Sequence, residues 1–279
     1  MFFILSGLSA EKTVSSEVTP VRGRAFGLFV GISDYPGRNL DLELCAQDAR
    51  RFHDALVQSG NIESGNAYIL TDRQATVENF ENSMRRIASR MAVGDVLVFF
   101  FSGHGDKQWR DTRQAAEPDM QDETLVLQDG EISDDRLAGL FAPLKKGVVL
   151  VIIDACFSGG FREDLIDRDG RLGLFSSEET ELSHLPGNIR AGGFLSGFVI
   201  DSVCDRICIA RADFDRNGEV TAQELVKYVQ DRYAKDMQKN DLIRDLRRNP
   251  AFDARLQHLV VADRRIAPFF KLFSSLRHF

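Results

Sequence analysis

The sequence has few cysteines, no excess of basic residues and no long apolar run, and each absence excludes a class of protein. Four cysteines in 279 residues are too few for a disulfide scaffold, and they lack the paired spacing of a zinc site. A formal net charge of −7 disfavours nucleic acid as a partner, because phosphate binding needs a basic face. No apolar run approaches the roughly 18 residues of a membrane-spanning helix.

What remains is typical of a globular chain, with 43% apolar and 28% charged residues. Residues 1–23 start with a short apolar run that has no Lys or Arg before it, so the run lacks the charged region of a signal peptide. We expect a poorly ordered leader and a cytoplasmic protein with reduced thiols. The alternative is an exported protein whose apolar run is the remnant of a truncated signal.

From Arg24 onward, short β-rich runs alternate with helical periodicities, which predicts an α/β domain. Two of the runs, 95–103 and 146–156, consist almost entirely of apolar residues, as in central strands that are covered on both faces. We expect a single domain with a mostly parallel sheet of six strands, flanked by helices. The predicted strands are 25–32, 67–71, 95–103, 123–127, 146–156, 171–177 and 258–263, with 123–127 at an edge or in a hairpin.

Two of the predicted central strands end in reactive side chains. His104 follows one in FFFSGHGD, and Cys156 follows the other in VIIDACFSGG. Ligands bind at the carboxyl ends of strands in open α/β sheets, so the imidazole and the thiol are expected to meet there. Glycines flank both residues, as expected where the backbone comes close to a substrate.

This pair suits nucleophilic catalysis, because a nearby imidazole favours the reactive thiolate and can protonate a leaving amine. The backbone N–H groups of Gly105 and Cys156 are candidates for the oxyanion hole. The alternative is a buried cysteine and a hydrogen-bonded histidine, which is the commoner role of either residue alone. Cys204 and Cys208 have no histidine near them in the sequence and are interpreted as core residues.

The SGHG motif at 102–105 and the DACFSGG motif at 154–160 make the chain resemble the caspase-like cysteine peptidases. Their separation of about 50 residues is that of caspases, but the residues around Cys156 resemble the metacaspase side of the clan. The resemblance extends over 24–262 and implies a caspase-like fold. It suggests a leader at 1–23, a peptidase domain at 24–263 and a C-terminal tail at 264–279, which we expect to dock on the core or on a partner.

Metacaspase-like pockets are acidic and accept Arg or Lys at P1, the substrate residue before the cleaved bond. Asp154 lies two residues before Cys156, so on an extended segment both side chains project to the same side. The resemblance implies Asp48 as the second pocket carboxylate, with Cys45 lining the same place. Two carboxylates favour Arg over Lys. Alternatively, Asp48 is a solvated helix residue and Asp154 a strand-end hydrogen-bond acceptor.

The loop 213–224, DFDRNGEVTAQE, matches the EF-hand calcium loop position by position, with Gly218 at the sharp turn. Alternatively, Thr221 and Glu224 form a capping box for the following helix. The predicted ligands are Asp213, Asp215, Asn217, Glu219, Thr221 and Glu224.

A second candidate calcium site follows from the resemblance, since metacaspases are activated through acids near the catalytic strands. It comprises Asp122, Asp134 and Asp135, with Glu163 or Asp164 as a further ligand. Alternatively, Asp134 and Asp135 only favour the N-terminus of a helix electrostatically.

The leading functional hypothesis is a cysteine endopeptidase that cleaves proteins or peptides after Arg or Lys, with possible activation by calcium. Self-cleavage would fall in the polar stretch after the nucleophile, at Arg162, Arg168 or Arg171, since nicking concentrates in exposed segments. The alternative is a catalytically silent, calcium-responsive interaction module on the same fold. The sequence leaves the physiological substrate and the oligomeric state open.

Overall fold

The computed structural model describes eight segments of the chain. They are residues 23–37, 40–109, 121–144, 147–184, 191–203, 210–236, 257–266 and 270–274. Nearly all of the predicted leader lies outside these segments, as do Cys204 and Cys208.

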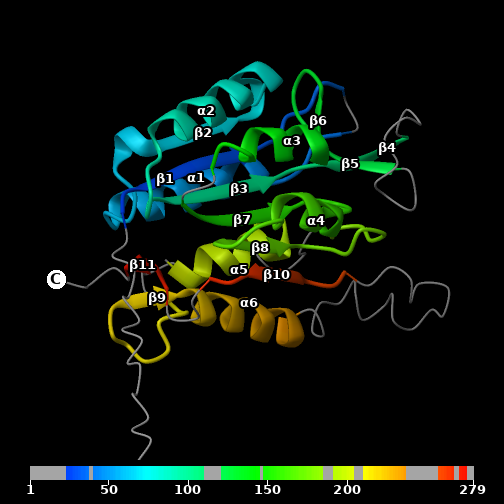
Figure 1. Cartoon of the computed structure of the whole chain (residues 1–279). Helices are drawn as coiled ribbons and strands as arrows, with labels where there is room; N and C mark the ends of the chain where they lie inside the picture. The colour runs from blue at the N-terminus through cyan, green and yellow to red at the C-terminus, as the bar shows by residue number, and fades with distance from the viewer. Residues whose placement is uncertain are drawn as a thin grey trace, which may run out of the picture.

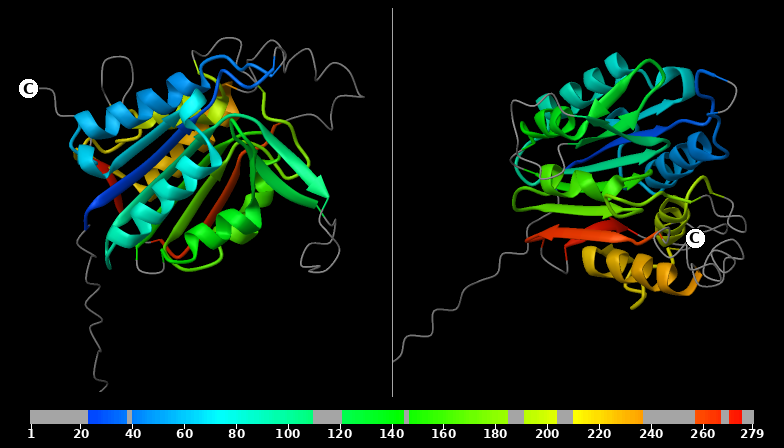
Figure 2. Two further views of the ribbon diagram at one scale, coloured as in Figure 1. Left: turned by 90° about the horizontal axis from the view of Figure 1, so that it is seen from above. Right: turned by 90° about the vertical axis from the view of Figure 1, so that its right-hand side faces the viewer.

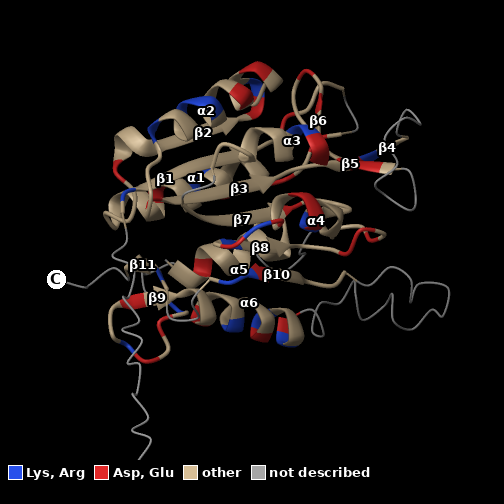
Figure 3. Cartoon of the chain, in the orientation of Figure 1, with Lys and Arg blue, Asp and Glu red and all other residues tan. Residues whose placement is uncertain are grey.

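A six-stranded sheet forms the centre of the molecule, in the order β10-β8-β7-β3-β1-β2 (Figure 1). Neighbouring strands are parallel except β10, which runs antiparallel to β8. Both β1 and β3 are buried along their whole length and carry no charged residue (Figure 3). The predicted six-stranded, mostly parallel sheet is therefore confirmed. Its strands are β1 (Ala25–Gly31), β2 (Ala67–Thr71), β3 (Val96–Ser102), β7 (Val148–Asp154), β8 (Arg171–Phe175) and β10 (Val260–Arg264).

Helices cover both faces of this sheet and form two buried clusters (Figure 2). Phe52 of α1 and Phe198 of α5 belong to the cluster on one face, which also includes α6. Phe80 of α2 and Phe161 of α4 belong to the cluster on the other face, which also includes α3. Apolar stripes at helical spacing explain why these segments pack against the sheet. The helices are α1 (Cys45–Gln58), α2 (Val77–Arg90), α3 (Asp134–Phe141), α4 (Phe161–Leu165), α5 (Phe194–Val203) and α6 (Ala222–Asp236).

A small antiparallel sheet follows the carboxyl end of β3 and contains β4 (Gly105–Trp109), β5 (Gln121–Val126) and β6 (Glu131–Ser133). The run predicted at 123–127 is thus a hairpin strand rather than part of the main sheet. Its partners β4 and β6 are short and largely polar, so no apolar alternation marked them in the sequence. The described residues also include three short 3₁₀ turns, at Ser64–Asn66 and Asp72–Gln74 on either side of β2 and at Ser158–Gly160 after β7.

The described part of the C-terminal tail packs on the chain's own core. Strand β11 (Lys271–Ser274) pairs antiparallel with β9 (Glu219–Thr221). Phe273 is fully buried, and its ring lies 6.4 Å from that of Phe52 in α1. Asn61 exchanges two hydrogen bonds with the backbone of Ser274. Within the described residues, every helix is too short or too polar to cross a membrane.

Candidate active site

The register between β3 and β7 brings the two reactive residues to the same edge of the sheet. Ser102 lies opposite Asp154 in this pair of strands, and the N–H of Gly103 donates to the Asp154 carbonyl at 3.2 Å. His104 and Cys156 each come two residues after these partners. Because the strands are parallel and in register, both residues emerge side by side from the carboxyl end of the sheet.

A cavity of about 370 Å³ lies at this edge and contains both reactive residues. Four residues predicted for the site line it, namely Cys45, His104, Asp154 and Cys156. Gly103, one of the glycines that flank His104, lines it too. Sequence reasoning missed Leu42, Ser183, His184 and Gly192, because no motif marks them and the last three come from segments distant in the chain.

The imidazole of His104 is positioned by its neighbours. Its ring centroid lies 4.7 Å from that of Tyr35, and its backbone N–H donates to the Tyr35 hydroxyl at 2.8 Å. Nε2 lies 2.7 Å from the carbonyl oxygen of Leu40. Since a carbonyl oxygen only accepts, Nε2 must carry the proton in the neutral ring. Nδ1 is therefore the nitrogen that remains able to accept a proton from a thiol.

The thiol of Cys156 is partly buried, and its Sγ donates to the carbonyl of Ser183 at 3.9 Å. Burial raises the pKa of this thiol, and the negative charge of Asp154 acts in the same direction. In the described conformation, then, the thiol is held as the protonated form. Nucleophilic attack by this thiol would require a base to take the proton first.

Asp154 is buried at the end of β7 and is held by two donors. The hydroxyl of Ser183 donates to Oδ1 at 3.0 Å, and the N–H of Ser196 donates to Oδ2 at 2.7 Å. Burial raises the pKa of this carboxyl, and the hydrogen bonds from Ser196 and Ser183 oppose the rise. A β-carbon at Gly193 would lie 2.1 Å from Oδ2, so only glycine fits beside this carboxylate.

Asp48 is fully buried on α1 rather than solvated. Its Oδ2 accepts from the N–H of Gly192 at 2.5 Å, and its Oδ1 lies 3.4 Å from the guanidinium of Arg51. Burial raises the pKa of Asp48 to about 7, against the effect of the Gly192 and Arg51 contacts. Burial likewise raises the pKa of Cys45 to about 12, so this second thiol stays protonated at neutral pH.

The EF-hand-like loop at 213–224 gathers three carboxylates. Oxygens of Asp213, Asp215 and Glu224 lie within 4.8 Å of one another. The Oδ1 of Asp213 is buried and has no hydrogen-bond partner, whereas its Oδ2 accepts from the N–H of Gly218. Thr221 and Glu224 also form the expected capping box, with Thr221 Oγ1 accepting from the Glu224 N–H at 3.2 Å and Glu224 Oε2 accepting from the Thr221 N–H at 2.9 Å.

The other predicted ligands of this loop have contacts of their own. Asn217 donates through its N–H and its side-chain amide to the carboxylate of Asp215. The carboxylate of Glu219 pairs with Lys271 of β11 at 2.7 Å. Glu219 could therefore offer a cation its backbone carbonyl, as position 7 of an EF-hand does.

The second predicted calcium set does not converge in the same way. Within the described segments, the loop at 213–224 holds the three-carboxylate group whose oxygens come together. Asp134 is fully buried and accepts from the backbone N–H groups of Glu123 and Asp135. Asp122 lies opposite Gln108 in the β4–β5 ladder, while Glu163 and Asp164 lie on α4. Calcium at these acids stays a prediction.

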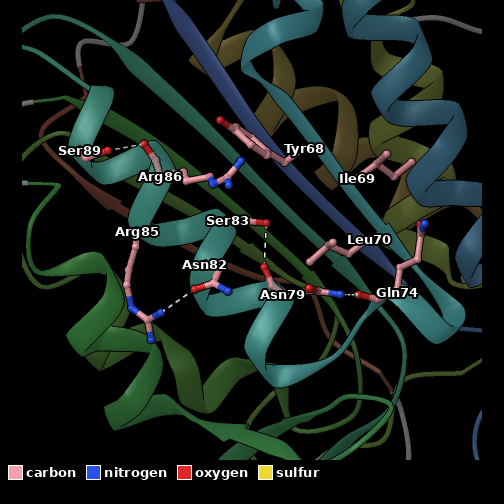
Figure 4. A pocket seen from close by; sticks show the side chains of 10 residues that line it. All are labelled: Tyr68, Ile69, Leu70, Gln74, Asn79, Asn82, Ser83, Arg85, Arg86 and Ser89. Carbon is pink, nitrogen blue, oxygen red and sulfur yellow. Dashed lines mark hydrogen bonds between the residues drawn. The ribbon is translucent and has the colours of Figure 1, made fainter.

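A larger cavity of about 750 Å³ lies between β2 and α2 (Figure 4). It is lined mainly by polar side chains, among them Arg85, Arg86 and Asn82. Neither a thiol nor an imidazole lines it. The smaller cavity is therefore the candidate active site, since it alone of the two contains a nucleophile and a base.

The fold has a match among solved structures. A crystal structure of a protein from Geobacter sulfurreducens matches 91% of this chain and 100% of its own length, with a TM-score of 0.60 at 18% sequence identity. At that identity the likeness shows the fold alone. A thiol and an imidazole at adjacent strand ends of this fold define a caspase-like cysteine peptidase.

Comparison with protein families identifies the family to which the chain belongs. The family of the metacaspase peptidase C14 domain matches residues 25–164, which include Asp48, His104, Asp154 and Cys156. The chain therefore belongs to the metacaspase family. The loop at 213–224 lies outside the matched range.

Curated relatives agree with this assignment. Metacaspase-2 of Arabidopsis thaliana is 34% identical over 173 residues, which are 57% of this chain and 41% of that protein. Metacaspase-1 of Mycosarcoma maydis is 32% identical over 155 residues, which are 51% of this chain and 38% of that protein. The match thus spans about two fifths of the length of these relatives.

Proposed function

We propose that this chain is a cysteine endopeptidase that cleaves protein or peptide substrates after Arg or Lys. The observation that carries the proposal is that one cavity is lined by the thiol of Cys156, the imidazole of His104 and the carboxylate of Asp154. These groups supply a nucleophile, a general acid and base, and a negative charge for a basic P1 side chain.

The proposed reaction starts when Nδ1 of His104 takes the proton of Cys156. The thiolate attacks the carbonyl carbon of the P1 residue, and the N–H groups of Gly105 and Cys156 stabilise the oxyanion. The C–N bond then breaks as the imidazolium returns the proton to the leaving amine. Water activated by His104 hydrolyses the thioester, which releases the acid and restores the thiol.

The P1 preference follows from the two buried carboxyl groups. Asp154 lines the cavity, and Asp48 lies behind Gly192, another lining residue. A guanidinium can bridge two carboxylates with paired hydrogen bonds, whereas an ammonium acts as a point charge. We therefore expect peptides with Arg at P1 to be cleaved faster than peptides with Lys at P1. Charge repulsion excludes Asp at P1.

Calcium is the proposed ligand of the loop at 213–224. Hard oxygen donors at positions 1, 3 and 12, provided by Asp213, Asp215 and Glu224, are those of an EF-hand. The buried Oδ1 of Asp213, which has no hydrogen-bond partner, supports the proposal because a cation would satisfy it. We expect a weak site, since the capping box already uses part of Glu224.

Self-cleavage is proposed at the exposed arginines after the nucleophile. Arg162 on α4 and Arg168 after it have side chains that are 43% and 33% exposed. Arg171 is excluded, because it is 1% exposed, which corrects the expectation of an exposed stretch up to this residue. Mass analysis of the activated protein would test the proposal, and a single intact chain would contradict it.

The competing function is a catalytically silent module, and one observation favours it. In the described conformation, Cys156 Sγ and His104 Nε2 each bond to a backbone carbonyl. Covalent labelling by a P1-Arg peptide electrophile distinguishes the two functions, since a working dyad directs the label to Cys156 at a far higher rate than to Cys45. Equal, slow labelling of both thiols would favour the silent module.

The decisive experiment is hydrolysis of matched fluorogenic peptides with Arg or Asp at P1, in calcium and then in chelator. Cys156→Ala serves as the blank. Cleavage of the Arg peptide alone supports the acidic pocket, and its loss in chelator supports calcium activation. Preferential cleavage of the Asp peptide would contradict the pocket assignment.

A further inference from the structure

A buried chain of hydrogen bonds reaches the proposed P1 pocket from the C-terminal part of the protein. Gln257, just before β10, is 4% exposed. Its Nε2 donates to the hydroxyl of Ser183 at 3.2 Å and lies 3.3 Å from the hydroxyl of Tyr233 in α6. Its Oε1 accepts from the N–H of His184 at 2.8 Å. Gln257 therefore fixes both residues of the segment that borders the cavity.

The hydroxyl of Ser183 is oriented by this arrangement. A serine hydroxyl has one proton and two lone pairs. Its oxygen accepts from the Gln257 amide at 3.2 Å, and Asp154 Oδ1, 3.0 Å away, can only accept from it, so the single proton of Ser183 is directed at Asp154. The Ser183 hydroxyl therefore donates to the pocket carboxylate.

Asp154 keeps the capacity to bind a guanidinium while it accepts these bonds. An ionised carboxylate offers about four lone-pair positions, and Ser183 and Ser196 use one on each oxygen. The two donors fix the plane of the carboxylate beside the cavity that it lines, and the hydroxyls of Ser176 and Ser196 also act on it. This arrangement suits a bidentate arginine, which requires two parallel acceptors.

We propose that Ser183 is a specificity-determining residue of the P1 pocket, which orients Asp154 for a P1 guanidinium, and that Gln257 is a positioning residue that holds Ser183. This inference rests on the proposed function. It links the C-terminal segment at 257–266 to substrate choice. It adds Ser183 to the pocket that Asp48, Asp154 and Cys45 were predicted to form.

The kinetic test compares Ser183→Ala with wild type on peptides that carry Arg or its uncharged analogue citrulline at P1. Loss of one charge-assisted hydrogen bond should raise KM for the Arg peptide about tenfold and leave kcat within about twofold. The KM for the citrulline peptide should change little. Ser183→Thr keeps a hydroxyl and should restore the Arg preference, and Gln257→Leu should lower it. The controls are Ser89→Ala and Gln223→Ala, at exposed positions.

Two results would overturn the proposal while wild type stays active. An unchanged ratio of Arg to citrulline cleavage in Ser183→Ala would make Ser183 merely structural. A rise in kcat/KM on both peptides would show instead that the Ser183 hydroxyl only holds this segment in place, with its backbone carbonyl on the thiol of Cys156.

A binding measurement separates failure of this inference from failure of the proposed function. Benzamidine carries an amidinium like that of arginine, and benzamide is its neutral counterpart. In a Cys156→Ala background, calorimetry should show benzamidine binding that Ser183→Ala weakens about tenfold. No preference for benzamidine over benzamide, or equal affinity in both variants, would overturn the inference whether or not the chain cleaves peptides.

Discussion

The backbone of Gly105 lies against the carbonyl of Cys156, so closely that a β-carbon at position 105 would be 2.1 Å from the Cys156 oxygen. This contact joins the ends of the two strands that carry the reactive residues. Glycine is needed here for space, since Gly105 has no unusual backbone angle among the described residues.

Gly105→Ala should separate the two strand ends without unfolding the protein. We expect kcat/KM on the P1-Arg peptide to fall by about 100-fold or more, because a misplacement of about 1 Å at reacting groups has that effect. The matched control is Gly139→Ala on α3, where a β-carbon meets nothing within 4 Å. Activity of Gly105→Ala at the level of this control would contradict the close approach.

The raised pKa of Asp48 predicts how recognition of the P1 residue depends on pH. Because its pKa is raised to about 7, the pocket gains negative charge as the pH rises through 7. The ratio of Arg to citrulline cleavage should therefore increase over this range, and taking the ratio removes effects common to both peptides. The charged or titratable groups around Asp48 include Arg51, Asp154 and Cys45.

Asp48→Asn should remove this rise and lower P1-Arg cleavage about tenfold or more. It should also change the pH dependence of stability. An aspartate carboxyl in an unfolded chain has a pKa of about 4, whereas burial in the folded protein raises the pKa of Asp48 to about 7. The stabilising contribution of this carboxyl is therefore present below about pH 4 and is lost as the pH rises through 7. Between about pH 5 and 8, the Tm of Asp48→Asn should therefore rise relative to the Tm of the wild type. A constant difference between the two Tm values would contradict the raised pKa of Asp48.

The loop at 213–224 should bind calcium weakly, and thermal unfolding measures it. Millimolar calcium is expected to raise the Tm of the wild type, because a ligand that binds the folded state stabilises it. Asp215→Ala removes a ligand that lies outside the capping box and should abolish the shift. Asp231→Ala, at an exposed acid on α6, is the control. An equal Tm shift in both variants would place calcium elsewhere.

We expect Arg171 to stabilise the fold rather than to serve as a cleavage site, so its substitution should lower stability. Its guanidinium donates to the carbonyls of Leu165 at 2.6 Å and Phe141 at 3.0 Å, and it pairs with Asp167 at 3.3 Å. Arg171→Met would leave two buried carbonyls without these donors, which costs about 2 to 4 kcal/mol of unfolding free energy in urea titrations. The exposed Arg162→Met should stay within about 0.5 kcal/mol, and an equal effect at both positions would refute the structural role.

Local patterns predicted much of the fold, because strand and helix periodicity is a short-range property. The central strands at 95–103 and 146–156 are present close to the expected bounds. The short strand β11 has only Lys271–Ser274, and its partner β9 lies about 50 residues earlier in the chain. Such a pairing has no sequence signal, since each partner contributes only three or four residues to the ladder.

The sequence by itself placed His104 and Cys156 at the ends of two apolar runs, which are typical of parallel strands in a covered sheet. It could not reveal that Gln257 contacts Ser183 and that Ser183 contacts Asp154, or that Arg171 is buried. These contacts join residues 6 to 74 positions apart, in segments without periodicity. Only tertiary packing decided them, because burial forced each polar group to find whichever partner the fold brought within reach.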